Sequence, residues 1–231
     1  MRSRNLAAAL VLLAATLTAF GCGGSTTNSV AAKSPRAIVA AALSTVNGAS
    51  SVHVSGGVGD KALIAIDLHF VTGRGCAGHL TVNGRLGVDI VRIGSKMYLK
   101  GSAAFWRDYV VIAAARLVGG KWSMVSASES DTATLASLTD LHKLLDPSAY
   151  RGKLTKSTTM TLDGKKAVSV EGRLRIRLFV AATGKPYPIE INALDALDAD
   201  RITFDEWNAP VTLTSPKSRA DRGRQDRFRT R

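Results

Sequence analysis

The chain has 231 residues, a net charge of +13 and 45% hydrophobic residues, and only two of its residues are cysteines. Two cysteines exclude a small scaffold held together by several disulfides. About 210 residues follow the N-terminal segment considered next, which is enough for one domain with a sizeable hydrophobic core.

The N-terminal segment has the pattern of a secretory signal peptide. Arg2 and Arg4 precede an uncharged apolar run over residues 6–20, and small residues follow it. The run has 15 residues, which is too short for a comfortable membrane span. A cysteine directly after the cleavage region, here Cys22, is typical of bacterial lipoproteins, in which its thiol receives a diacylglycerol. We therefore expect a signal peptide over residues 1–21 and a lipidated Cys22 as the mature N-terminus, exported and anchored at the extracytoplasmic face of the cell membrane.

An alternative is cleavage by ordinary signal peptidase, because Ala19-Phe20-Gly21 also fits that site. Cys22 would then keep a free thiol, and a disulfide with Cys76 becomes an option in an oxidising compartment. If Cys22 is acylated, Cys76 is a lone buried or half-buried thiol. The Gly-, Ser- and Thr-rich composition of residues 22–33 favours acylation, because a tethered domain needs a flexible polar linker.

The other end of the chain is strongly basic. Residues 216–231 contain seven basic side chains, two acidic ones and a single aromatic residue. This composition predicts a disordered tail. A basic tail can bind nucleic acid, but an exported protein meets anionic phospholipid or cell-wall polymer instead. We expect no nucleic-acid partner and one folded domain over residues 34–215.

The domain begins with a predicted helix. Ser34 and Pro35 are a favourable N-cap and first helical residue, and apolar residues recur at helical spacing as far as Asn47-Gly48. From Ser51 the period changes to two, which predicts strands with tight turns at Asn83-Gly84 and Gly94-Ser95.

Two further helical segments interrupt the strands. Residues 105–117 are mostly apolar and rich in alanine, and they predict a helix or a helix and a loop. Residues 131–145 predict another helix, ended by Asp146-Pro147. The second half then returns to alternating strands, one of them over residues 173–180 with Arg173, Arg175 and Arg177 on one face.

The count is about ten amphipathic strands and three helical segments. A sheet with one apolar face needs a cover for that face. We predict an α+β fold, in which helices cover the concave face of a large curved antiparallel sheet, a half-barrel. A closed barrel with external helices is the alternative.

The sequence offers no constellation for catalysis. It has no G-x-S-x-G elbow, no G-x-G-x-x-G and no phosphate-binding loop. Asp205 and Glu206 are adjacent, so on a strand they would face opposite sides. The histidines, His53, His69, His79 and His142, match no standard metal-ligand spacing, although two of them flank Cys76. We predict no enzymatic activity, no metal and no cofactor.

Four segments resemble one family. They are Ile93 to Leu99 in the first half, Gly120-Lys121-Trp122, the hairpin over residues 162–168 and the closing segment over residues 204–211, which Ser215-Pro216 follow. Together they resemble the LppX/LprG-type envelope lipoproteins of actinobacteria and, more remotely, the LolA/LolB lipoprotein carriers. The resemblance implies a half-barrel around an apolar pocket, acylated lipids or glycolipids as ligands, a monomeric state and envelope transport partners.

The apolar helical segments are where such a pocket is expected. The candidate pocket residues are Phe105, Tyr109, Ile112, Ala113, Leu117, Leu135, Leu138 and Leu141. The alternative is that these residues fill an ordinary core. The protein would then be a membrane-tethered, non-enzymatic interaction module that binds anionic polymer or partner proteins.

Overall fold

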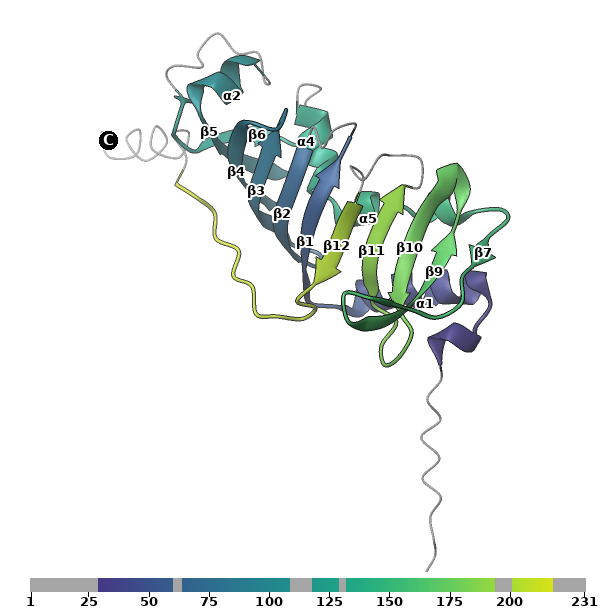
Figure 1. Ribbon diagram of the computed structural model, residues 1–231. Coiled ribbons are helices and arrows are strands. Elements are labelled where there is room, and N and C mark those ends of the chain that lie inside the picture. Colours follow the sequence, from purple (N-terminus) through teal and green to yellow (C-terminus); the bar gives the residue numbers. More distant parts are fainter. Residues whose placement is uncertain (1–28, 60–63, 109–117, 129–131, 194–200, 218–231) are drawn as a thin grey trace, which may run out of the picture.

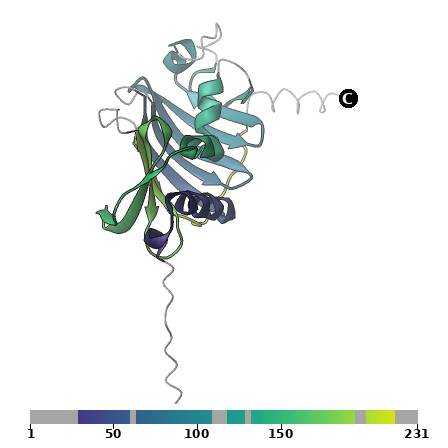
Figure 2. The same ribbon diagram turned by 90° about the vertical axis from the view of Figure 1, so that its right-hand side faces the viewer.

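A computed structural model describes residues 29–59, 64–108, 118–128, 132–193 and 201–217. Twelve strands form one open antiparallel sheet in these residues, and short helices lie on one of its faces (Figures 1 and 2). The predicted α+β half-barrel is therefore confirmed, with twelve strands instead of about ten. The predicted helical segment 105–117 lies mostly outside the described residues.

The strands run in sequence order across most of the sheet. The strands are β1 (Ser51–Val58), β2 (Ile64–Val71), β3 (Gly75–Val82), β4 (Leu86–Ile93), β5 (Lys96–Gly101), β6 (Ser123–Ser126), β7 (Thr155–Lys156), β8 (Met160–Leu162), β9 (Lys165–Glu171), β10 (Ile176–Ala181), β11 (Pro188–Ala193) and β12 (Arg201–Asp205). Their order in space is β6-β5-β4-β3-β2-β1-β12-β11-β10-β9-β7, and β8 also pairs with β9. The last strand, β12, thus joins the N-terminal and C-terminal halves by pairing with β1.

Alternation of side chains gives the sheet one apolar and one polar face. Val52 and Val54 of β1, for example, are buried beneath the helices, whereas His53 and Ser55 point to the other side. The inward side chains of nearly every strand belong to a single core cluster. A smaller cluster of Ala167, Phe179 and Ile189 lies apart from it, beside the β8 hairpin.

The helices are short apart from the first. They are the 3-10 turn η1 (Val30–Ala32), α1 (Pro35–Gly48), α2 (Ala103–Asp108), α4 (Ala133–Leu138), α5 (Leu141–Leu144) and the 3-10 turns η3 (Pro147–Tyr150) and η4 (Arg173–Arg175). Ser34 caps α1 by accepting a hydrogen bond from the Ala37 N–H, as predicted. Figure 2 shows α1, α4 and α5 inside the curve of the sheet.

The prediction of a single helix over residues 131–145 is wrong in detail, because the structure has two helices there, α4 and α5, separated by Thr139 and Asp140. The Thr139 hydroxyl donates back to the carbonyls of Leu135 and Ala136, which ends α4. Asp140 then caps α5 by accepting from the His142 N–H at 3.1 Å. The run of apolar residues at helical spacing therefore continues across the end of α4 and the start of α5.

The strand predicted over residues 173–180 begins later than expected. Arg173 to Arg175 form the turn η4, and Arg175 has a φ of +53°. Only Arg177 of the three arginines lies within β10, where it bonds Glu171 at 3.3 Å. The continuous basic strand face does not exist.

Within the described ranges, we find no helix that combines the length and the apolar character needed to span a bilayer.

Candidate functional site

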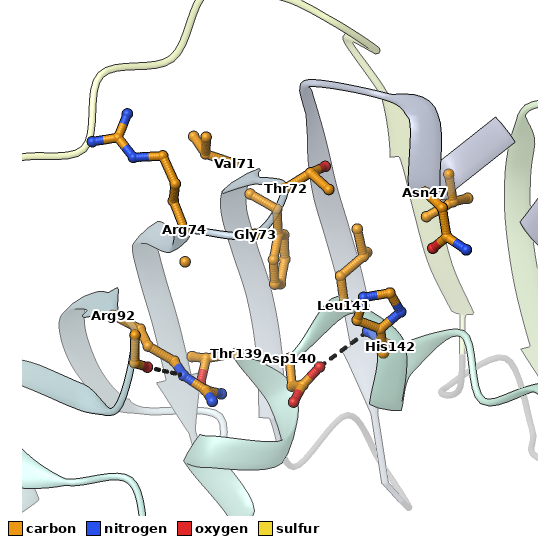
Figure 3. A pocket seen from close by; sticks show the side chains of 14 residues that line it. Asn47, Val71, Thr72, Gly73, Arg74, Arg92, Thr139, Asp140, Leu141 and His142 are labelled. Atoms are coloured by element: carbon orange, nitrogen blue, oxygen red, sulfur yellow. Dashed lines mark hydrogen bonds between the residues drawn. The ribbon is translucent and has the colours of Figure 1, made fainter. Parts of the chain in front are cut away.

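A pocket of about 210 Å³ opens at one end of the concave face (Figure 3). Its walls come from four places: the C-terminal end of α1, the β2–β3 turn, the end of β4 and the junction of α4 with α5. It therefore lies between the sheet and its helical cover, which is the place where the family resemblance implies a ligand.

The pocket has an apolar floor and a polar rim. Val46 of α1, Phe70 of β2 and Leu141 of α5 supply apolar surface, and all three belong to the core cluster. Arg74, Arg92, Asp140 and His142 bring charge or hydrogen-bonding groups to the opening. Such a division suits an amphiphile, with its chain against the floor and its polar end at the rim.

Arg92 holds the two sides of this site together. It occupies an inward-facing position on β4, opposite Cys76 and Met97 of the neighbouring strands. Its guanidinium donates to the Ala136 carbonyl at 2.8 Å and to the Thr139 hydroxyl at 3.2 Å. It thereby joins the Thr139 hydroxyl in hydrogen-bonding the Ala136 carbonyl near the end of α4.

Arg74 is the rim cation best placed to receive a ligand. It lies exposed on the turn between β2 and β3. Across the described part of the chain, no hydrogen bond or ion pair of its side chain is found. An anionic head group at the opening would meet this guanidinium without displacing a protein partner.

Cys76 lies behind the pocket and is not exposed to it. Its free thiol is fully buried, with Sγ 3.8 Å from the Thr139 carbonyl. Burial raises the pKa of the Cys76 thiol to about 12, although the nearby Arg92 acts in the opposite direction. A thiol held neutral in this way acts as a small apolar side chain and not as a nucleophile.

The structure brings only one of the predicted pocket residues to this opening. Leu141 lines the pocket. Phe105, Leu135 and Leu138 are buried in the same core cluster, packed with other side chains. Tyr109, Ile112, Ala113 and Leu117 lie outside the described residues.

A second pocket, of about 650 Å³, lies by the β8–β9 and β10–β11 hairpins. Lys165, Lys166 and Lys185 line it together with Tyr187 and Trp207, whose rings stack at 4.7 Å. Trp207 is fixed there by a hydrogen bond from its indole to the Pro188 carbonyl. Sequence reasoning missed this pocket, because its lysines come from separate hairpins.

Two solved structures have the same architecture. LprF from Mycobacterium bovis superimposes with a TM-score of 0.53 at 17% identity, over 79% of this chain and 96% of that one. The lipoprotein LppX from Mycobacterium tuberculosis superimposes with a TM-score of 0.52 at 19% identity, over 78% of this chain and 100% of that one. This chain has the LppX fold. The predicted resemblance to LppX/LprG-type lipoproteins is thus confirmed at the level of the fold.

The likeness to LppX is structural and not visible in sequence profiles. No protein-family profile matches the sequence, and no curated protein is similar to it. The short motifs on which the resemblance was first based are turns and strand ends, as at Gly94, where the chain passes from β4 to β5 with a φ of +59°. They specify how the half-barrel folds, and not what it binds.

Proposed function

We propose that this protein is a cell-envelope lipoprotein that binds, and passes on, an acylated lipid or glycolipid at the pocket between the sheet and α5. The observation that carries the proposal is the division of this pocket into an apolar floor and a polar rim that includes the exposed Arg74. The LppX fold and the predicted anchor at Cys22 support it independently. The protein acts as a carrier and not as an enzyme.

The size of the pocket limits what it holds in this state. Ligand pockets that enclose a small molecule usually have about 300–1,000 Å³, and this one has about 210 Å³. It is therefore large enough for part of one acyl chain. Each methylene group buried there adds about 0.8 kcal/mol to the free energy of binding. A two-chain lipid requires α4 and α5 to move off the sheet, and these helices are only six and four residues long.

Native mass spectrometry of protein purified from its own host tests this proposal most directly. We expect an adduct of lipid mass that is lost on denaturation. A pocket variant, Thr72→Trp, places an indole at the opening and should lower lipid occupancy at least about tenfold. Thr81→Trp is the matched control, because Thr81 is half-buried on the polar face of β3 and does not line the pocket. Ligand-free protein, or equal occupancy in both variants, would contradict a lipid site here.

The anchor is tested separately. Cys22→Ser should move the protein from the membrane fraction to the soluble fraction or block its processing, because two or more acyl chains are needed for stable attachment. Mass spectrometry of the N-terminal peptide of the parent protein should show the added acyl mass. An unmodified Cys22 at the mature N-terminus would instead support cleavage by ordinary signal peptidase.

The lysine-lined pocket favours a second candidate function, binding of an anionic envelope polymer. Three ammonium groups beside two stacked aromatic rings form a surface that attracts polyanions. Dextran sulfate can serve as the probe. Joint replacement of Lys165, Lys166 and Lys185 by glutamine should abolish its binding if this function holds, whereas the exposed control set Lys96, Lys153 and Lys217 should not.

A further inference from the structure

A cluster of titratable side chains lies on the polar face of the sheet, away from both pockets. It consists of His53 on β1, Asp67 and His69 on β2, and Asp205 and Glu206 at the end of β12. We call it the histidine cluster. It lies where β1 pairs with β12, which is the junction between the two halves of the sheet. Its members therefore come from the adjacent strands β2 and β1 and from the end of β12.

Strand register explains how the cluster forms. His53 is directly opposite His69 on one side and Asp205 on the other. Directly opposite residues point to the same face, and the two imidazole rings stack with centroids 4.4 Å apart. Glu206 joins them because it has left the strand with a φ of +48°. Asp205 and Glu206 therefore both reach this cluster, although on a regular strand they would face opposite sides.

Both nitrogens of His53 are already engaged by carboxylates. Its Nδ1 lies 2.7 Å from Asp205 and its Nε2 lies 3.0 Å from Asp67. The Nδ1 of His69 lies 3.8 Å from Glu206. His53, Asp67 and His69 each offer one potential metal-ligand atom. These three atoms all lie within 4.8 Å of one another.

We propose that this cluster binds a zinc ion through His53, Asp67 and His69. Two imidazoles and one carboxylate are a common ligand set for Zn²⁺, with water in the remaining position. Tetrahedral bonds of 2.0–2.1 Å place donor atoms about 3.3 Å apart. The Nε2 of His53 and the Asp67 carboxylate are already at 3.0 Å. His69 has to approach by rotating its ring, which is 40% exposed and stacked on His53.

Asp205 acts as the positioning residue. When it accepts a hydrogen bond from Nδ1–H of His53, it fixes the tautomer in which Nε2 carries the lone pair. A carboxylate behind a histidine ligand is the usual second contact of zinc sites. Because Asp205 lies on β12 and the ligands lie on β1 and β2, a bound ion links all three strands.

Charge balance also favours a cation here. The cluster holds three carboxylates within reach of the two histidines. An imidazole nitrogen must be unprotonated to bind zinc, so the affinity should fall as the pH drops below neutral.

The experiment is a calorimetric zinc titration of untagged full-length protein after treatment with a chelator. We expect one ion per chain, and at least about tenfold weaker binding in both His69→Gln and Asp67→Asn. The matched control is His79→Gln. His79 lies on the same face, opposite Asp67, and contacts Asp89 at 3.0 Å, but the group of candidate ligands within the described residues does not include it. The control should bind zinc as the parent protein does.

A second measurement separates a zinc site from a cluster that binds only protons. Asp205→Asn should weaken zinc about 10- to 100-fold, although Asp205 is not a ligand. Zinc should also raise the melting temperature of the parent and of His79→Gln, but not of His69→Gln. Equal zinc affinity in the parent and in His69→Gln, or no zinc-dependent rise in melting temperature, would overturn the proposal.

Discussion

The guanidinium of Arg92 on β4 donates a hydrogen bond of 2.8 Å to the carbonyl of Ala136 in α4. A charged side chain at an inward-facing strand position thus fastens the helical cover to the sheet. Its partners among the described residues are main-chain and hydroxyl oxygens, with no carboxylate among them. Its loss would leave the end of α4 without these hydrogen bonds.

We expect Arg92→Met to lower the free energy of unfolding by about 2 kcal/mol, because hydrogen bonds from a charged donor contribute about 1.5–3 kcal/mol. Urea denaturation followed by circular dichroism measures the change. Arg74→Met is the control, since Arg74 is exposed on the same edge of the sheet. An equal effect of the two changes would show that the contact with α4 contributes nothing specific.

Glu190 is nearly fully buried, and its main partner is Arg201, whose Nε lies 2.6 Å away. Removing the arginine leaves a buried carboxylate for which Asn192 is the one remaining side-chain donor among the described residues. We therefore expect Arg201→Met to cost about 3 kcal/mol of stability. The double variant with Glu190→Gln should recover a good part of this loss in the same urea assay. No recovery would mean that Arg201 stabilises the sheet through packing or through Asp163 instead.

His53 should make stability depend on pH in metal-free protein. Burial disfavours its charged form, but hydrogen bonds to Asp67 and Asp205 outweigh that effect and raise its pKa above the ordinary 6.5. His69, 4.4 Å away, and Glu206 are the other titratable groups that face it. A raised pKa in the folded state stabilises the protein fully below 6.5, and this contribution disappears as the pH rises through the folded-state pKa.

The measurement for His53 is the melting temperature in a chelating buffer between about pH 5 and pH 8.5. The difference between the parent and His53→Gln should be largest at the acidic end and should shrink toward the alkaline end. A difference that grows with pH would mean that His53 is neutral in the folded protein.

Cys76 should resist alkylation in the native state. Its thiol is fully buried and its pKa is raised to about 12, so little thiolate is present. We expect iodoacetamide to modify the Cys76 peptide at least about 100-fold more slowly in native than in urea-denatured protein. Rapid native labelling would reveal that the helices lift off the sheet, as entry of a two-chain lipid requires.

Gly101 should not tolerate a side chain. A Cβ at this position would overlap the ring of Phe105, the first large side chain of α2. We expect Gly101→Ala to cost about 1–3 kcal/mol by overpacking. Gly48→Ala is the control, because nothing lies near its Cβ position and it is helical, so the change should be neutral or slightly stabilising.

Local patterns predicted local structure well. The cap at Ser34, the first helix and the alternating strands all depend on residues close in sequence, and they were found where the pattern indicated them, apart from the late start of β10. The break at Thr139 and Asp140 was missed because polar caps were hidden within an apolar repeat. Leu141 was predicted at the pocket, but its polar rim was not, since Arg74 and Arg92 meet α5 only after the sheet has curved.

The histidine cluster could not be predicted from the sequence. His53 and Asp205 are 152 residues apart, and no spacing rule relates them. Only the pairing of β1 with β12 places them side by side. The proposed ligands His53, Asp67 and His69 lie on the paired strands β1 and β2, but their spacing matches no standard metal-ligand motif.

The central position of β12 has a consequence for synthesis. Residues 201–205 are among the last of the domain to leave the ribosome, yet they fill the gap between β1 and β11. A nascent chain without them has two unpaired strand edges facing each other, which invite pairing with other chains. The continuous sheet can form only after the whole domain has been translated. A chain that stops before residue 201 would leave the edges of β1 and β11 unpaired and should be prone to aggregate.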